Sequence, residues 1–324
     1  MPDAAVSYGF LLPTRELVMS QATPEVSQII DLAERAEGLA FDSVWVGDSI
    51  LARPRLEAFT TLAAVAARVR RVKVGTAVLL PALRHPVVMA NEAANVDLLS
   101  EGRLILGLGI ATKMPSVRAE FEACGVSIDH RLGIFEETVS LMRRLWREPS
   151  VTFSGRHFQL QDVSLGLRPY NASGIPLWIA GAVDNALHRV ARLGDGWYPN
   201  PVSPQVFAEQ SQQLDGFARQ AGRDPQALHR CVYTTLNIND DVAQAERETK
   251  TFVENYYNAP YDVIARLQSI CYGTPDTCIA WLRDFAAAGA QTIVIRFACP
   301  DQVGQLERCA ADILPQAAPQ GEKP

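Results

Sequence analysis

The chain has 324 residues, of which 48% are apolar and 20% charged, proportions that are typical of a globular enzyme and exclude a disordered chain. A formal net charge of -6 argues against a nucleic-acid or anionic membrane partner. The first residues lack the pattern of a signal peptide, and no apolar run is long enough to span a membrane, so we expect a cytoplasmic protein.

The six cysteines are scattered along the chain, without a Cys-x-x-Cys pair or a histidine at zinc-binding spacing. We therefore expect reduced thiols, and neither a disulfide framework nor a metal site.

Eight short apolar segments are predicted to be β-strands, and most of them precede a segment with helical periodicity. The strands cover Val6–Leu12, Phe41–Val46, Val72–Leu80, Leu104–Gly109, Pro176–Gly181, Asp195–Trp197, Cys231–Ile238 and Thr292–Phe297. The helices cover Val26–Gly38 with a cap at Thr23-Pro24, Phe59–Val69, Pro86–Leu99, Arg131–Trp146, Asp184–Leu193, Pro204–Ala221, Asp241–Ile270 with a break near Asn258, Pro275–Ala288 and Asp301–Leu314. A β-hairpin with a turn at Ser154-Gly155 is expected over Val151–Leu167.

Strands that alternate with helices over this length are typical of an α/β protein of the (β/α)₈ TIM-barrel class. A doubly wound open sheet is the alternative, but no glycine-rich dinucleotide fingerprint follows the first strand. We expect one domain over residues 1–314, with insertions near 111–128, 151–170 and 256–274, and a flexible tail over 315–324. The active site of such a barrel lies at the C-terminal ends of its strands.

The segment from Val72 to Lys113 has the most distinctive pattern. A strand stops near Pro81, a helix starts at His85-Pro86, and the next strand ends in Gly107-Leu108-Gly109. The residues that follow Gly75 are small, which suits either an ordinary buried strand end or close contact with a flat ligand.

This segment, GTAVLLPALRHPVVMANEAANVDLLSEGRLILGLGI, resembles the flavin-dependent family of bacterial luciferase-like monooxygenases. The segments FDSVWVGDS, HRLGIFEETVSLMRRLW, IPLWIAG, ARLGDGWYP and GAQTIVIRF resemble the family in the same order along the chain. The resemblance implies a TIM barrel, a homodimer, and a cofactor that is reduced FMN or the deazaflavin coenzyme.

For the reaction, the resemblance favours a monooxygenase that oxygenates a small organic substrate through a flavin hydroperoxide, with reduced FMN from a separate flavin reductase. Two alternatives stay open. One is a deazaflavin-dependent dehydrogenase or reductase that transfers hydride, and the other is a flavin-binding protein without catalytic activity. The sequence does not name the substrate.

The resemblance also implies which residues contact the cofactor. They are Thr76, Ala77, Val78, Gly109, Lys113, Arg131, Gly181, Ala182 and Val183. The ring is expected on Thr76–Val78, where similar proteins have a non-prolyl cis peptide at the position of Ala77–Val78. The phosphate is expected near Arg131 and the loop Gly181–Val183, since backbone N–H groups and guanidinium groups bind anions. Lys113 is a second phosphate candidate.

Asp48 and Ser49 end the second strand, which is a catalytic position in this fold. Many relatives carry a histidine directly after an acidic residue here, as a general acid or base. Ser49 takes that position in this chain, and a serine does not titrate near neutral pH. Asp48 is then either a substitute for the histidine or a capping or ion-pair residue.

The candidate substrate contacts are Arg53, Arg55, Trp197 and Arg296. Arg53 and Arg55 suit an anionic substrate or the negative edge of a reduced flavin, and a solvated basic loop is the alternative. For Arg296 on the last strand, a structural ion pair competes with a role at the barrel mouth.

Overall fold

The structure, a computed structural model, describes residues 6–20, 23 and 25–317. Eight of the nine strands of its parallel sheet close into a barrel, in which the last strand pairs back with the first. In barrel order they are β1 (Ser7–Leu11), β2 (Ser43–Val46), β3 (Lys73–Leu79), β4 (Leu104–Leu108), β7 (Leu177–Ile179), β8 (Gly196–Trp197), β9 (His229–Ile238) and β11 (Thr292–Phe297). This result confirms the predicted TIM barrel and its eight strands.

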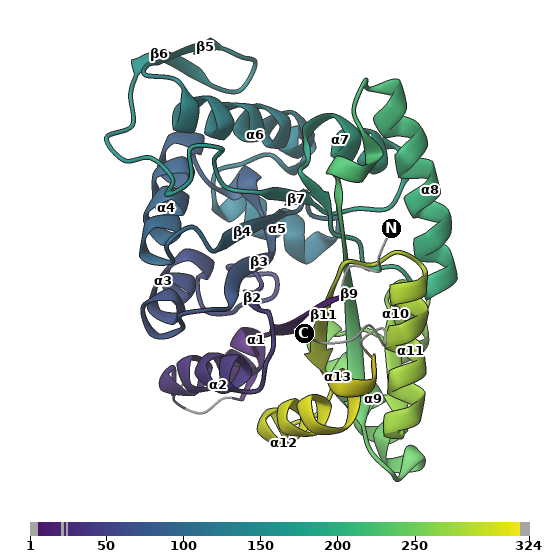
Figure 1. Cartoon of the computed structure of the whole chain (residues 1–324). Helices are drawn as coiled ribbons and strands as arrows, with labels where there is room; N and C mark the ends of the chain where they lie inside the picture. The colour runs from purple at the N-terminus through teal and green to yellow at the C-terminus, as the bar shows by residue number, and fades with distance from the viewer. Residues whose placement is uncertain (1–5, 21–22, 24, 318–324) are drawn as a thin grey trace.

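Helices surround the barrel on its outer side (Figure 1). The longer ones are α2 (Ser27–Gly38), α3 (Ala58–Arg68), α4 (Pro86–Leu99), α5 (Pro115–Ala123), α6 (Arg131–Arg147), α7 (Asp184–Leu193), α8 (Pro204–Gln220), α9 (Val242–Tyr257) and α11 (Pro275–Ala287). Four of them have proline in the first turn, where no backbone N–H is needed. The predicted cap of α2 includes Pro24, which lies outside the described residues. Within the described ranges, no helix combines the length and the apolar composition needed to cross a membrane.

Two elements were not predicted from the sequence. Helix α1 (Thr14–Met19) follows β1 directly, and β10 (Ile270–Gly273) pairs in parallel with the last residues of β9. Strand β9 has ten residues and β8 pairs only with its first two, so the rest of that edge is available to β10. The four residues of β10 are too few to show a period of their own next to the helices that flank them.

The expected insertions contain separate small elements. An antiparallel hairpin of β5 (Val151–Ser154) and β6 (Gln159–Val163) confirms the predicted one and stands outside the barrel beyond α6 (Figure 1). The first insertion contains α5, and the third contains α10 (Tyr261–Ala265) and β10. After α12 (Gln302–Arg308) and one π-helical turn, α13 (Leu314–Ala317) extends into the predicted tail, and residues 318–324 lie outside the described part of the chain.

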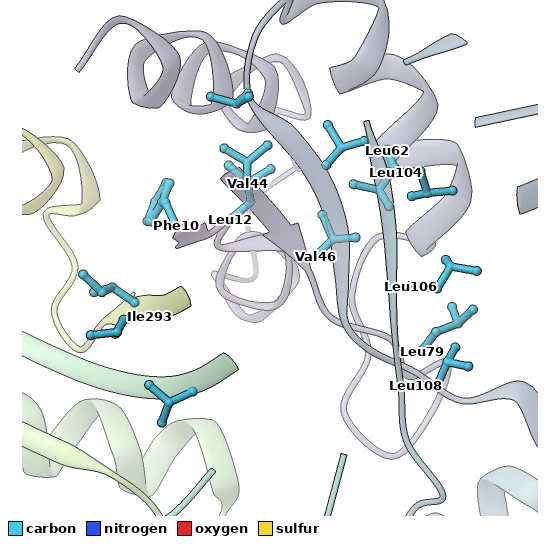
Figure 2. Packing of buried hydrophobic residues seen from close by; sticks show 14 of the residues in the cluster. Phe10, Leu12, Val44, Val46, Leu62, Leu79, Leu104, Leu106, Leu108 and Ile293 are labelled. Carbon is cyan, nitrogen blue, oxygen red and sulfur yellow. The ribbon is translucent and has the colours of Figure 1, made fainter. Parts of the chain in front are cut away.

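Most of the hydrophobic core lies between the strands and the helices around them. Along the first strands, Phe10, Leu12, Val44 and Val46 face this outer layer (Figure 2). Alternate residues such as Trp45 face the barrel interior instead, as the period of a strand requires.

Large aromatic side chains fill the interior of the barrel. The Trp45 ring centroid lies 5.4 Å from that of Trp178 and 5.4 Å from that of Tyr198. Glycines on neighbouring strands make room for these rings, because a Cβ atom at Gly75 would overlap Trp45 and one at Gly196 would overlap Trp178. These rings therefore leave the ends of the strands, and not the middle of the barrel, as the place for a small molecule.

His229 is half-buried at the start of β9, at the N-terminal end of the barrel. Its ring stacks on Trp178 with a centroid distance of 4.4 Å, and its Nε2 lies 2.9 Å from Thr292 Oγ1. Burial, together with the charges of Lys73 and Arg230, lowers the pKa of His229 to about 4. Because an unfolded histidine titrates near pH ~6.5, the unfolded chain binds more protons in the window between these values. Stability that depends on neutral His229 is therefore lost as the pH falls through that window.

We predict that His229→Gln makes stability less dependent on pH. Between about pH 7.5 and about pH 5, the wild type should lose about 2 kcal/mol more unfolding free energy than the variant. Urea unfolding of both proteins at the two pH values measures this difference. The carboxyl groups that also titrate are the same in both proteins, so their contribution cancels in the comparison. Equal losses in the two proteins would contradict the prediction.

Candidate active site

A cavity of about 640 Å³ opens at the C-terminal ends of the barrel strands. Its walls come from the ends of β1 and β3, from Tyr233 of β9, from the loops after β2, β4 and β7, and from parts of α5, α6, α7 and α9. The volume lies within the range of small-molecule sites, and the position is the one expected for an active site in this fold.

Small residues form one wall of the cavity. Ala77, Val78 and Gly109 line it, and the peptide bond between Ala77 and Val78 is cis, at the predicted position. A Cβ atom at Gly109 would lie 2.6 Å from Val78 Cγ2, so a larger residue there would collide with β3. Thr76 does not line the cavity, because its fully buried hydroxyl donates a hydrogen bond to the carbonyl of Gly107 at 2.7 Å.

The N-terminus of α7 borders the cavity. The predicted loop Gly181–Val183 lines it, and among the described residues no side chain caps the helix that starts at Asp184. Gly181 has a φ of 119°, a conformation that other residues rarely adopt. Free N–H groups at a helix N-terminus bind anions.

The two candidate phosphate ligands occupy different places. Arg131 lines the cavity, and its guanidinium donates hydrogen bonds to the carbonyls of Ala111 at 3.2 Å and Ile128 at 3.1 Å. Lys113 does not line the cavity and forms an exposed ion pair with Asp129. The geometry therefore favours Arg131 over Lys113 as the candidate phosphate ligand.

Trp197 supports the site from outside the cavity. Its ring stacks on Phe207 at a centroid distance of 5.1 Å, and its Nε1 donates to the Gly181 carbonyl at 2.7 Å. Trp197 thus holds the loop before α7 and does not reach the space where a substrate would lie.

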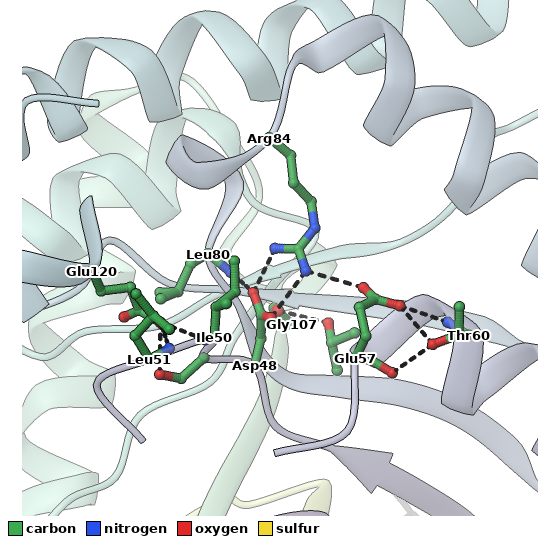
Figure 3. A network of polar contacts seen from close by, with 11 residues as sticks. Asp48, Ile50, Leu51, Glu57, Thr60, Leu80, Arg84, Gly107 and Glu120 are labelled. Atoms are coloured by element: carbon green, nitrogen blue, oxygen red, sulfur yellow. Dashed lines mark hydrogen bonds and ion pairs between the residues drawn. The ribbon is translucent and has the colours of Figure 1, made fainter. Parts of the chain in front are cut away.

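Asp48 lines the cavity but is engaged in a buried ion pair with Arg84 (Figure 3). Its Oδ2 accepts hydrogen bonds from Leu80 N at 2.9 Å and Arg84 Nη1 at 2.7 Å, and its Oδ1 accepts from Arg84 Nη2 at 3.0 Å. Burial alone would lower the pKa of Arg84, but its bonds to Asp48 and Glu57 raise the pKa above the usual range. This geometry favours the ion-pair role of Asp48.

Ser49 contacts a carboxylate that the sequence did not reveal. Its Oγ donates to Glu120 Oε1 at 2.8 Å, and the same oxygen accepts the backbone N–H groups of Ile50 and Leu51 (Figure 3). Glu120 is 1% exposed and lines the cavity. One signal was available in the sequence, because Glu120 shares the apolar face of α5 with Val117 and Phe121.

The three candidate arginines lie on one side of the barrel mouth. Arg53 and Arg55 line the cavity beside Tyr256 and Tyr257 of α9. Arg296 is fully buried next to the same two tyrosines and does not line the cavity itself.

The sequence model of the family described as luciferase-like monooxygenase matches residues 6–292. The chain belongs to this family. Among curated relatives, the F420-dependent glucose-6-phosphate dehydrogenase of Kineococcus radiotolerans is 28% identical over 323 residues, which cover 90% of this chain and 93% of the relative. The 5,10-methylenetetrahydromethanopterin reductase of Methanolobus tindarius is 27% identical over 228 residues, which cover 70% of this chain and 67% of the relative.

Two solved structures share the fold. An F420-dependent secondary alcohol dehydrogenase has a TM-score of 0.82 at 20% identity, and the monooxygenase RslO1 of Streptomyces bottropensis has 0.80 at 24%. Each match covers 96% of this chain and 99% of the other. The chain is thus an oxidoreductase of the luciferase-like family, with a cofactor of the flavin type.

We predict that Asp48→Asn lowers the unfolding free energy by about 3 kcal/mol, because the buried guanidinium of Arg84 loses its carboxylate partner. Urea unfolding measures the change. Glu57→Gln is the matched control, because the side chain of Glu57 is 44% exposed and its loss should cost less than about 1 kcal/mol. Equal stabilities of the two variants would show that Asp48 is not held by Arg84 as described.

Proposed function

We propose that this chain is an F420-type deazaflavin-dependent oxidoreductase that transfers hydride between its cofactor and an alcohol or carbonyl substrate. The observation that carries the proposal is the hydrogen-bonded pair of Ser49 and Glu120 at the cavity wall. Oxidation of an alcohol releases a proton as well as a hydride, and this pair offers a route for the proton at the position where many relatives have histidine. Curated relatives named as F420-dependent enzymes support the same choice.

The residues around the cavity suit the cofactor. Ala77, Val78 and Gly109 leave room for a flat ring, while Arg131 and the free N–H groups of α7 suit a phosphate. When bound, a 5-deazaflavin supplies a carbon centre that accepts or donates hydride and is poorly reactive toward dioxygen.

The hydroxyl of Ser49 has one hydrogen and two lone pairs. The hydrogen is donated to Glu120 Oε1, and one lone pair accepts the backbone N–H of Arg53 at 2.9 Å. The second lone pair can accept a hydrogen bond from a substrate hydroxyl. As the alcohol becomes a carbonyl, its hydroxyl proton passes to Ser49 Oγ and the Ser49 proton passes to Glu120. Carbonyl reduction reverses both transfers.

A monooxygenase that uses reduced FMN, the first expectation from the sequence, is the second candidate. It is favoured by Ser49 in place of histidine, because oxygenation by a reduced flavin does not require a side-chain base at that position.

A titration with F420, FMN and, under anaerobic conditions, reduced FMN tests the choice. We predict that F420 binds more tightly than either form of FMN, and that a panel of secondary alcohols and sugar phosphates includes one that reduces bound F420.

Arg131→Gln should weaken F420 binding about tenfold, the effect of losing one charged hydrogen bond. Lys113→Gln is the matched control and should bind like the wild type.

Other results lead to other functions. Preferred binding of reduced FMN with oxygen uptake would support the second candidate, and cofactor binding without turnover would support a flavin-binding protein. If none of the three compounds binds, both the deazaflavin-dependent oxidoreductase and the FMN-dependent monooxygenase are rejected as functions of this cavity.

We predict that Glu120→Gln lowers kcat for alcohol oxidation by about 10²-fold and leaves F420 affinity unchanged. Glutamine keeps an acceptor oxygen for Ser49, Ile50 and Leu51 but does not take up the proton at neutral pH. Steady-state kinetics and fluorescence titration measure the two quantities. The control is Glu122→Gln, on the exposed side of the same helix, which should behave like the wild type. An unchanged kcat in the Glu120 variant would remove Glu120 from the proton route.

A further inference from the structure

Four arginines from three separate segments converge on Tyr256 and Tyr257. We name them the arginine cluster: Arg15 on α1, Arg53 and Arg55 after β2, and Arg296 on β11. The guanidinium carbons of Arg15, Arg55 and Arg296 lie 5.0, 6.0 and 4.4 Å from the Tyr256 ring centroid, and that of Arg53 lies 5.0 Å from the Tyr257 centroid.

The arginines of the cluster are not paired with carboxylates. None of its members forms a salt bridge with a carboxylate of the described residues. Arg296 is 1% exposed, donates to Tyr257 Oη at 3.0 Å and Thr235 Oγ1 at 2.9 Å, and has no partner for its Nε within that part of the chain. Arg15 is 8% exposed, and its Nε and Nη1 are likewise unpartnered there. A buried guanidinium without an anion destabilises the fold.

Nearby groups only partly compensate for this charge. Four aromatic rings, those of Tyr233, Phe252, Tyr256 and Tyr257, lie within 4.4 to 5.6 Å of the Arg296 guanidinium, and their faces attract a cation but do not neutralise it.

Two carboxyl groups also face the cluster. Burial raises the pKa of Glu16, and the charges of Arg296, Arg55 and Arg15 oppose this shift. Asp48 acts on Arg55 from the barrel mouth but is engaged with Arg84. Because Asp48 is already paired with Arg84, only Glu16 is left to balance four arginines, and the cluster keeps a net positive charge.

The cluster adjoins the active-site cavity, away from the expected phosphate site. Arg53, Arg55 and Tyr257 line the same cavity as Ser49 and Glu120. The cluster comes from the side of β11, β1 and β2, whereas Arg131 and α7 belong to the side of β4 and β7, which is opposite in the closed barrel.

We infer that the arginine cluster binds a negatively charged group of the substrate, a carboxylate or a phosphate. The reaction at Ser49 and Glu120 would then take place on a part of the substrate that lies between the cluster and the cofactor. This inference rests on the proposed function for the reaction, but binding of an anion to the cluster can be tested without any cofactor.

Calorimetric titration at low salt with benzoate, phenyl phosphate and benzyl alcohol tests the binding. Every protein in the experiment carries Arg131→Gln, because Arg131 lines the other end of the cavity. Arg189, which also lines that end, is paired with Glu136. We predict that at least one of the two anions binds and that benzyl alcohol does not. Adding Arg55→Gln should lower the affinity for the anion about tenfold or more. The anion that binds more tightly identifies the group. Equal binding of anion and neutral alcohol, or no effect of Arg55→Gln, would overturn the inference.

Arg15→Met separates ligand binding from a structural role. Methionine has a similar length and needs no counter-ion, so the ligand-free variant should melt at a higher temperature than the parent. The rise in melting temperature that the bound anion gives the parent should be lost in the variant. A lower melting temperature with unchanged anion binding would show that Arg15 serves the fold. Failure of F420 to bind, with these anion results intact, would overturn the proposed function alone.

Discussion

The filled interior of the barrel is the constraint on which the site depends. Trp45, Trp178 and Tyr198 occupy the space inside the strands, and they fit because neighbouring strands carry glycine where a larger residue would overlap them. Because these rings fill the middle of the barrel, the active-site cavity lies where the strands end. The strand ends, the loops that follow them and the neighbouring parts of α5, α6, α7 and α9 therefore provide the walls of the cavity.

Charge is distributed unevenly around that cavity. Arg131 and the N-terminus of α7 offer positive charge and N–H groups on one side, and the arginine cluster does so on the other. Glu120 lines the same cavity, and its Oε1 is held by three donors from a single loop. The cavity thus has positively charged groups on two sides and one hydrogen-bonded carboxyl group in its wall.

Buried ion pairs and unpaired charges have different consequences in this site. Asp48 and Arg84 satisfy each other and fix the loop after β2. The unpartnered nitrogen atoms of Arg15 and Arg296 make the burial of these side chains unfavourable in the absence of a bound anion. We interpret Asp48 and Arg84 as residues that hold the site together, and the arginine cluster as the group that binds a ligand.

The sequence by itself determined the eight barrel strands, the hairpin and most helices, because each depends on a local period of apolar residues or on a local proline or glycine. It also located Arg131, the loop Gly181–Val183 and the cis bond at Ala77–Val78, through motifs that are contiguous in the chain. Only the tertiary structure decided the partners of polar side chains: Asp48 with Arg84, Ser49 with Glu120, and the arginines with Tyr256 and Tyr257. These partners lie far apart in the sequence, and no local pattern encodes a contact that forms only when the barrel closes.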